Sequence, residues 1–245
     1  MRGALAAPAL ALALAGCGGA AAGGPARHDA AQAPAFRVAH DTRPSRPRGR
    51  YLIARLVSPA LMHATPGGRA LGHLRVRTEF GSPKVLGVLR RRGAWLQVLT
   101  PERPNGRPVW IAAARARLSG TDLAVVVDRS ARRLELRHGA RVLRTMPVAV
   151  GRPQTPTPTG RFAVTDKLRT GSPDSPYGCC ALALSGHQTK LIAGWPGGDR
   201  LAIHATPQPE TIGHAVSLGC MRAPTGGIRA LMRAVPLGTP VFVRS

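Results

Sequence analysis

The sequence predicts a mainly β protein with one short helix, arranged as two β units behind an irregular N-terminal segment. Three observations lead to this prediction. Residues 51–119 contain short apolar stretches separated by turn-forming Pro and Gly residues. Residues 123–150 contain runs of apolar residues and stretches in which apolar and polar residues alternate, as in β-strands. Apolar residues spaced as on one face of a helix occur over 228–235, close to the C-terminus.

The composition narrows the class of partner before any motif is considered. The chain has 245 residues, which is long enough for two modest domains with a core each. Its net charge of +24 invites a nucleic-acid interpretation, but the basic residues are spread along the chain and aromatic residues make up only 4% of it. Nucleic-acid-binding modules instead cluster basic side chains among stacking aromatics. The spread of the charge and the low aromatic content argue against a nucleic-acid partner and favour an anionic cell wall or membrane surface as the partner.

The N-terminus predicts an exported protein. A positive start at Arg2 precedes an apolar run over 4–14, which is too short to span a bilayer comfortably. The next residues, Leu14-Ala15-Gly16-Cys17, resemble the lipobox of bacterial lipoproteins. The resemblance implies that 1–17 is a lipoprotein signal peptide, that Cys17 carries the lipid, and that the mature protein is anchored to a membrane of the cell envelope. An ordinary secretory signal that contains a cysteine is the alternative.

Residues 18–50 are predicted to form a disordered tether. They consist mainly of Ala, Gly, Pro and Arg, with almost no large apolar side chains. Such a segment buries too little apolar surface to offset the entropy of ordering it.

Residues 51–119 are predicted to form a small β-barrel. Its five expected strands lie at 51–57, 71–74, 85–89, 95–99 and 109–111. The stretch that contains Trp95 and Val98, together with Trp110 and Ile111, resembles bacterial SH3-like domains. The resemblance implies a role in wall binding or in shaping a catalytic cleft, although both tryptophans also suit a half-buried core position.

Residues 120–245 are predicted to form a second domain, a mainly antiparallel β-sandwich. It begins after the turn-forming pair Ser119-Gly120, and the helical spacing over 228–235 provides its single helix. Its expected strands lie at 123–128, 133–137, 142–150, 161–165, 179–184, 201–204 and 241–243.

The candidate chemistry lies between His204 and Arg222. Cys220 follows Gly219 in a run of small residues, and Arg222 adds a fixed positive charge. A thiol attacks a carbonyl as the thiolate, so it needs a neighbouring base and donors for the oxyanion that forms. His204 can be that base, and a glycine before the nucleophile lets the backbone bend sharply and approach the substrate. Arg222 can bind a carboxylate through two hydrogen bonds.

This stretch resembles the signature of the L,D-transpeptidases, or YkuD-type domains. Their pattern is His-Gly-Thr, a loop, then Ser-His-Gly-Cys, an aliphatic residue and Arg or Asn. The order of the strands and the segments "VAVG" at 148–151 and "TPTG" at 157–160 also resemble this family, so that the resemblance extends over 123–243. The matching residues are His204, Thr206, Gly213, Ser217, Gly219, Cys220, Met221 and Arg222.

Two positions depart from the family pattern. Ala205 stands where Gly or Ser is usual, but the family uses the backbone carbonyl of this residue to hold the imidazole, and alanine supplies a carbonyl equally well. Leu218 stands where a second histidine is usual, and a leucine can neither tune the charge of the thiol nor hydrogen-bond the substrate. The general base of the family is the first histidine, which is present as His204.

The resemblance implies a peptidoglycan enzyme that acts on stem peptides. Cys220 would attack the third residue of a tetrapeptide stem, release D-alanine and form a thioester, which an amine of a neighbouring stem would resolve as a 3→3 cross-link. Backbone groups of Leu218, Gly219 and Cys220 would hold the oxyanion. Three further residues would support the substrate or the turn: Arg222 as a carboxylate partner, Ser217 as a brace of the turn and Tyr177 as a substrate contact or a packed residue.

The remaining cysteines and the polar residues suggest no cofactor. A disulfide between the adjacent Cys179 and Cys180 is sterically awkward, so we expect two reduced residues on opposite faces of a strand. No CxxC pair or histidine cluster has the spacing of metal ligands. Neither a metal nor an organic cofactor is therefore expected, and the sequence does not indicate an oligomeric state.

Two other functions remain compatible with these residues. Transfer of the acyl group to water would make the protein an L,D-carboxypeptidase, because the shape of the cleft decides the acceptor. In a protein of another class, a non-catalytic wall-binding lipoprotein, Leu218 would mark an impaired site.

Overall fold

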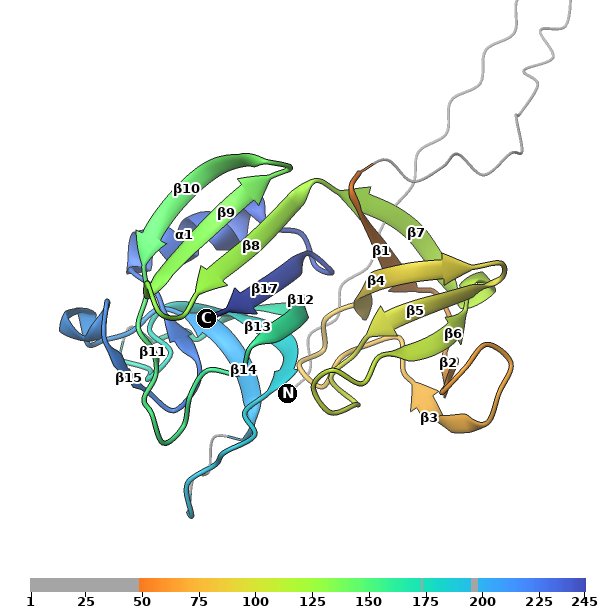
Figure 1. Ribbon diagram of the computed structural model, residues 1–245, viewed down its shortest axis with the longest axis horizontal. Helices are drawn as coiled ribbons and strands as arrows, with labels where there is room; N and C mark the ends of the chain where they lie inside the picture. Colours follow the sequence, from red (N-terminus) through yellow and green to blue (C-terminus); the bar gives the residue numbers. More distant parts are fainter. Residues whose placement is uncertain (1–48, 173, 195–197) are drawn as a thin grey trace, which may run out of the picture. The chain divides into compact units, whose positions relative to one another are not determined.

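The computed structural model describes residues 49–172, 174–194 and 198–245 (Figure 1). The described residues are mainly β with one short α-helix, which confirms the predicted class. They lie in one compact unit. Cys17, the predicted signal peptide and nearly all of the predicted tether lie outside the described residues. No helix in the described part of the chain is long and apolar enough to cross a bilayer.

The first half of the described chain forms a seven-stranded antiparallel sheet with the order β3-β2-β6-β5-β4-β1-β7. All five expected strands are present, and two more occur, β2 and β7. Both were missed because β2 follows the turn-forming pair Ser58-Pro59 without regular alternation, and β7 contains the Ser119-Gly120 pair that resembled a turn. The SH3-like assignment stays a prediction. The bounds are β1 Tyr51–Leu56, β2 Ala60–His63, β3 Ala70–Leu74, β4 Val85–Arg92, β5 Trp95–Leu99, β6 Val109–Ala112 and β7 Ala116–Thr121.

The second half forms an eight-stranded sheet with the order β10-β9-β8-β17-β12-β13-β14-β16, and a two-stranded sheet of β11 and β15. Most neighbours are antiparallel, but β8 with β17, β14 with β16 and β11 with β15 are parallel. The bounds are β8 Leu123–Asp128, β9 Arg133–His138, β10 Arg141–Pro147, β11 Val150–Gly151, β12 Gly160–Arg169, β13 Cys180–His187, β14 Arg200–His204, β15 Ala215–Ser217, β16 Met221–Arg222 and β17 Pro240–Arg244.

Strand β12 joins the two parts of the eight-stranded sheet. Its first residues, Gly160–Ala163, pair with β17, and its later residues, Val164–Arg169, pair with β13. Buried side chains from both parts form one apolar core with helix α1, which runs from Thr225 to Ala234. This core holds β14 and β16 in place, and these are the strands that carry the site.

Helix α1 begins three residues before the expected start at Ile228. The expectation followed the apolar spacing, in which Ile228 and Leu231 are indeed buried. Two glycines, Gly226 and Gly227, precede them and are poor helix formers, so the pattern did not predict this first turn. Gly227 lies close to Met146, because an added Cβ would be only 2.6 Å from the Met146 sulfur. Close packing thus explains a glycine in this turn.

The prediction for Cys179 and Cys180 was wrong. The structure joins the two sulfurs in a disulfide. The prediction assumed that both residues lie in one strand, where neighbouring side chains point to opposite faces. Strand β13 begins at Cys180, whereas Cys179 belongs to the preceding turn. The alternation of a strand therefore does not apply to this pair.

Candidate functional site

The pairing of β14 with β16 brings the two candidate catalytic residues together. In this parallel register His204 lies opposite Arg222, and Cys220 comes directly before β16. Both candidates line one cavity of about 250 Å³. The lining residues are Pro176, Tyr177, Gln188, Leu191, Gly198, Asp199, Arg200, His204, Ser217, Leu218, Cys220 and Arg222. Of the predicted site residues that the structure describes, only Gly219 and Ala205 do not line it.

His204 is held in a defined orientation. Its side chain is buried, and Nδ1 lies 2.5 Å from the carbonyl oxygen of Ala205. A carbonyl can only accept, so Nδ1 of the neutral ring carries the proton and the lone pair is on Nε2. Burial lowers the pKa of His204 to about 4, a hydrogen bond to Ala205 opposes this shift, and the charge of Arg222 adds to it. At neutral pH the ring is therefore an uncharged acceptor.

Cys220 is a free cysteine whose side chain lines the cavity. Its Sγ lies 3.7 Å from the carbonyl oxygen of Arg200. Burial raises the pKa of Cys220 to about 11, although a backbone hydrogen bond with Ala202 and the charge of Arg222 both act to lower it. Because the neighbouring imidazole is also neutral, the resting pair is a thiol and an imidazole rather than an ion pair. A thiol in this state has to lose its proton in order to act as a nucleophile.

The turn before Cys220 is braced by side-chain hydroxyls. The Ser217 hydroxyl donates to the Cys220 carbonyl at 2.6 Å and accepts from the Gly219 N–H at 3.0 Å. Two threonines of the "TPTPTG" segment also donate, Thr155 to the Ser217 carbonyl and Thr157 to the Gly219 carbonyl. The Gly219 N–H is thus already satisfied within the turn. Within the described residues, the N–H groups of Leu218 and Cys220 have no protein acceptor.

Gln188 is a site residue that sequence reasoning missed. Its amide nitrogen donates to the Leu218 carbonyl at 2.7 Å and lies within 3.3 Å of the Thr155 and Pro156 carbonyls. A Cβ on Gly219 would lie 2.1 Å from this nitrogen, and Gly219 has a φ of +124°. Glycine is therefore required at 219 for both space and backbone conformation. No local motif surrounds Gln188, so the sequence carries no signal for it. The structure reveals it through its burial and its hydrogen bonds.

Tyr177 lies against the imidazole of His204. The ring centroids are 5.1 Å apart and the planes meet at 74°, the edge-to-face arrangement that aromatic rings favour. Burial, and to a lesser extent the neighbouring Cys220, raise the pKa of Tyr177. The turn that carries Tyr177 is tightly packed on the site, because a Cβ on Gly178 would lie 2.6 Å from the Ala205 side chain. The predicted contact residue is thus next to both reacting groups.

Arg222 is oriented by two neutral side chains. One of its guanidinium nitrogens donates to Gln208 Oε1 at 3.0 Å and to Thr211 Oγ1 at 3.3 Å. The described residues provide no carboxylate partner for it. Its charge is therefore available to an anionic group that enters the cavity.

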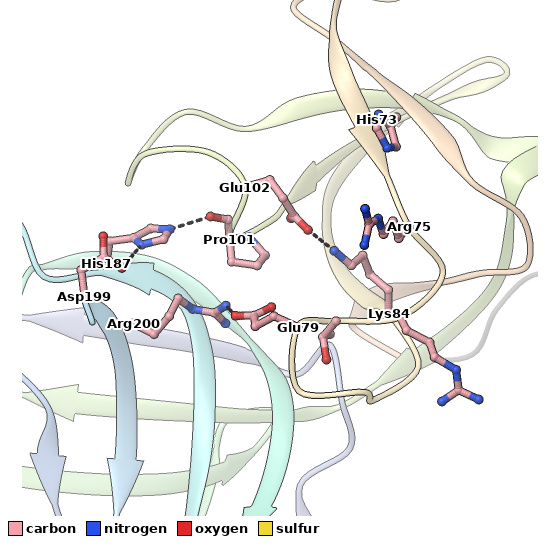
Figure 2. Close-up of a pocket in the computed structure, with 11 residues that line it drawn as sticks. His73, Arg75, Glu79, Lys84, Pro101, Glu102, His187, Asp199 and Arg200 are labelled. Carbon is pink, nitrogen blue, oxygen red and sulfur yellow. Dashed lines mark hydrogen bonds and ion pairs between the residues drawn. The ribbon is translucent and has the colours of Figure 1, made fainter. Parts of the chain in front are cut away.

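A second cavity, of about 470 Å³, lies where the two large sheets meet (Figure 2). Arg200 lines both cavities, and its guanidinium forms an ion pair with Glu79 of the loop between β3 and β4. Asn105 exchanges two hydrogen bonds with the backbone of His187, one at 2.7 Å and one at 2.8 Å. These contacts connect loops of the first sheet to β13 and to β14, the strand that carries His204.

In the part of the chain that the structure describes, no group of three or more His, Cys, Asp or Glu side chains could hold a metal ion. The polar side chains at the catalytic cavity are arranged around the thiol instead. They can orient a base, support a turn and attract an anion.

Comparisons with solved structures find L,D-transpeptidases. The X-ray crystal structure of an L,D-transpeptidase from Mycobacterium tuberculosis H37Rv is 21% identical, with a TM-score of 0.42 over 56% of this chain and 64% of that chain. The NMR structure of the catalytic domain from an E. faecium L,D-transpeptidase is 26% identical, with a TM-score of 0.37 over 50% of this chain and 97% of that chain.

The sequence comparisons match the second half of the chain. Two curated relatives, candidate L,D-transpeptidases named YkuD from Bacillus subtilis strain 168 and from Bacillus licheniformis, are 35% and 34% identical over 119 residues. These alignments cover 49% of this chain and 64% of each relative. The family model of YkuD, the L,D-transpeptidase catalytic domain, matches residues 122–243. Residues 122–243 of this chain are therefore similar to the L,D-transpeptidase catalytic domains of the YkuD family.

Proposed function

We propose that this protein is a cysteine acyl-transferase of peptidoglycan, an L,D-transpeptidase that forms 3→3 cross-links. One observation carries the proposal: Cys220 and His204 line the same cavity, with the lone pair of His204 on Nε2. The family of residues 122–243 supports the same reaction class.

The reaction begins with transfer of the thiol proton. Nε2 of His204 takes this proton as Cys220 Sγ attacks the carbonyl of the third stem residue. The bond between this carbonyl and D-alanine breaks, His204 returns the proton to the leaving amine, and a thioester remains. An amine of a second stem then attacks the thioester, and the sulfur leaves and regains a proton through His204. Proton transfer during attack fits a pair that is neutral at rest.

The oxyanion is held by backbone donors of the turn. The N–H groups of Leu218 and Cys220 are the best candidates, because the Gly219 N–H already donates to Ser217. Removing one donor of this kind from a hydrolase typically slows turnover by about 10²–10³-fold. Leu218 contributes through its backbone in this proposal, so its apolar side chain does not abolish the mechanism. Arg222 binds a substrate carboxylate, and Tyr177 covers the reacting groups.

We further propose that the protein acts outside the cytoplasm as a lipid-anchored envelope protein. The sequence Leu14-Ala15-Gly16-Cys17 supports this location, with a lipid on Cys17. The tether of residues 18–50 then separates the membrane from the catalytic domain, and the first sheet, as an SH3-like module, contacts the wall or shapes the cleft.

The reaction can be tested with the full-length chain, a tetrapeptide stem and a second stem that carries the acceptor amine. We expect release of D-alanine and a cross-linked product, both absent with Cys220→Ala and with His204→Gln. Release of D-alanine without cross-linked product at saturating acceptor would contradict transpeptidation and indicate a carboxypeptidase. No release from a folded parent protein would instead favour the wall-binding function.

A further inference from the structure

A third cavity, of about 450 Å³, lies on the second domain and shares no lining residue with the other two cavities described above. We call it the basic cavity. Four of its lining residues are cations and none has a carboxylate. The lining residues are Lys167, Arg169, Cys179, Cys180, Arg229, Met232 and Arg233.

The four cations come from two elements that are distant in sequence. Lys167 and Arg169 are two positions apart on β12, where side chains two apart share one face. Arg229 and Arg233 are four positions apart on α1, where side chains four apart also share one face. The fold thus places both pairs of cationic side chains at the same cavity. Arg169, Arg229 and Arg233 are exposed, so water partly screens their repulsion and their donor groups stay open to an anion that enters the cavity.

The charges of the basic cavity are not neutralised by the protein. Among the described residues, no ion pair involves Arg169, Arg229 or Arg233. Lys167 donates to the carbonyl of Met232 at 2.9 Å, which fixes its ammonium group near the C-terminal end of α1. Burial lowers the pKa of Lys167, because its ammonium group loses contact with water. In the described part of the chain, no carboxylate stabilises the charged form in return. The partial negative charge at the C-terminal end of α1 can stabilise one or two of these cations, but not all four.

We propose that the basic cavity binds the phosphate group of a phosphate ester. A carboxylate has two oxygens and is satisfied by a single guanidinium, whereas a phosphate offers three or more oxygens to several forked donors. Three guanidinium groups and one ammonium around one space match the larger anion. The phosphate can belong to an ester in solution or to a lipid headgroup, and both have the same chemistry at this site.

The test is an NMR titration of the 15N-labelled full-length chain with glycerol 3-phosphate at low ionic strength. We expect saturable shifts of the amides of Lys167, Arg169, Arg229 and Arg233. The double variant Arg229→Gln, Arg233→Gln should bind about tenfold or more weakly, since it loses two charge-assisted contacts. A matched control is Arg141→Gln, Arg144→Gln, which removes the same charge from exposed positions of β10.

Equal weakening in the cavity variant and in the control would overturn the proposal, because binding would then depend on net charge alone. Acetate that binds as tightly as glycerol 3-phosphate would overturn it as well. Sedimentation with vesicles of phosphatidylglycerol in phosphatidylcholine then identifies the source. If the cavity variant fails to sediment with the vesicles and the control variant sediments, the ligand is the lipid headgroup. If both variants sediment equally and only the cavity variant binds glycerol 3-phosphate more weakly, the ligand is an ester in solution.

Discussion

At the residue scale, the site depends on how two titratable groups are kept neutral. Burial lowers the pKa of His204 to about 4 and raises the pKa of Cys220 to about 11. Near pH 7 the imidazole of His204 is above its pKa and therefore uncharged, and the thiol of Cys220 is below its pKa and therefore also uncharged. This differs from cysteine enzymes whose thiolate is preformed beside an imidazolium. Here the imidazole of His204 is uncharged, with its lone pair on Nε2.

The buried histidine predicts how stability depends on pH. Between pH 6.5 and about 4 the unfolded chain binds a proton on His204 that the folded chain does not bind. The free energy of unfolding should therefore fall as the pH drops through this window. The His204→Asn variant lacks this group, so its free energy of unfolding should fall less than that of the parent over the same pH range. Urea unfolding at about pH 7 and about pH 5 measures this difference. An exposed control, His214→Asn, should behave like the parent; equal pH dependence in all three proteins would contradict the assigned burial of His204.

At the element scale, the sequence predicted strands better than it predicted the supports of the site. Alternation and apolar runs indicated the long strands of both sheets, because burial on one face constrains every second residue. Strands β2 and β7 did not show a clear pattern of this kind. His204, Cys220 and Arg222 were predicted from their chemistry, their spacing and a family resemblance, whereas Gln188 was not predicted. A glutamine that supports a turn thirty positions away leaves no periodic or motif signal, and only the folded sheet brings the two together.

The contacts of Gln188 predict that it is a positioning residue for the turn 217–220. The variant Gln188→Glu keeps the size of the side chain but replaces a donor with a carboxylate, which would face the Leu218, Thr155 and Pro156 carbonyls. We expect the rate of Cys220 acylation to fall by about tenfold or more, because a displaced turn misplaces the nucleophile and its donors. The acylation rate by stopped-flow or quenched mass spectrometry measures the effect.

The matched control for this variant is Gln154→Glu. This glutamine is exposed and does not line the cavity that contains Cys220. Acylation of Gln154→Glu should stay close to that of the parent. Unchanged acylation of a folded Gln188→Glu would show that the turn does not need this support.

At the scale of the whole molecule, the two large sheets have separate apolar cores but are joined by polar contacts. Thr78 of the loop between β3 and β4 donates to the buried Asp166 of β12 at 2.5 Å. Arg200, on the strand that ends with His204, pairs with Glu79 of the same loop. The sequence predicted two β units but not these contacts, because each links single residues that are far apart in the chain. The first sheet is thus attached beside the catalytic cavity.

The central claim is that Cys220 is an activated acyl acceptor although Leu218 replaces a usual histidine. Intact-mass spectrometry of the full-length chain with a carbapenem tests it most directly, because an acylated thiol adds the mass of the drug. We predict one adduct per chain on the parent and none on Cys220→Ala. Unmodified parent protein that is folded, and that a tetrapeptide stem also fails to acylate, would contradict the claim. So would an adduct that persists in Cys220→Ala.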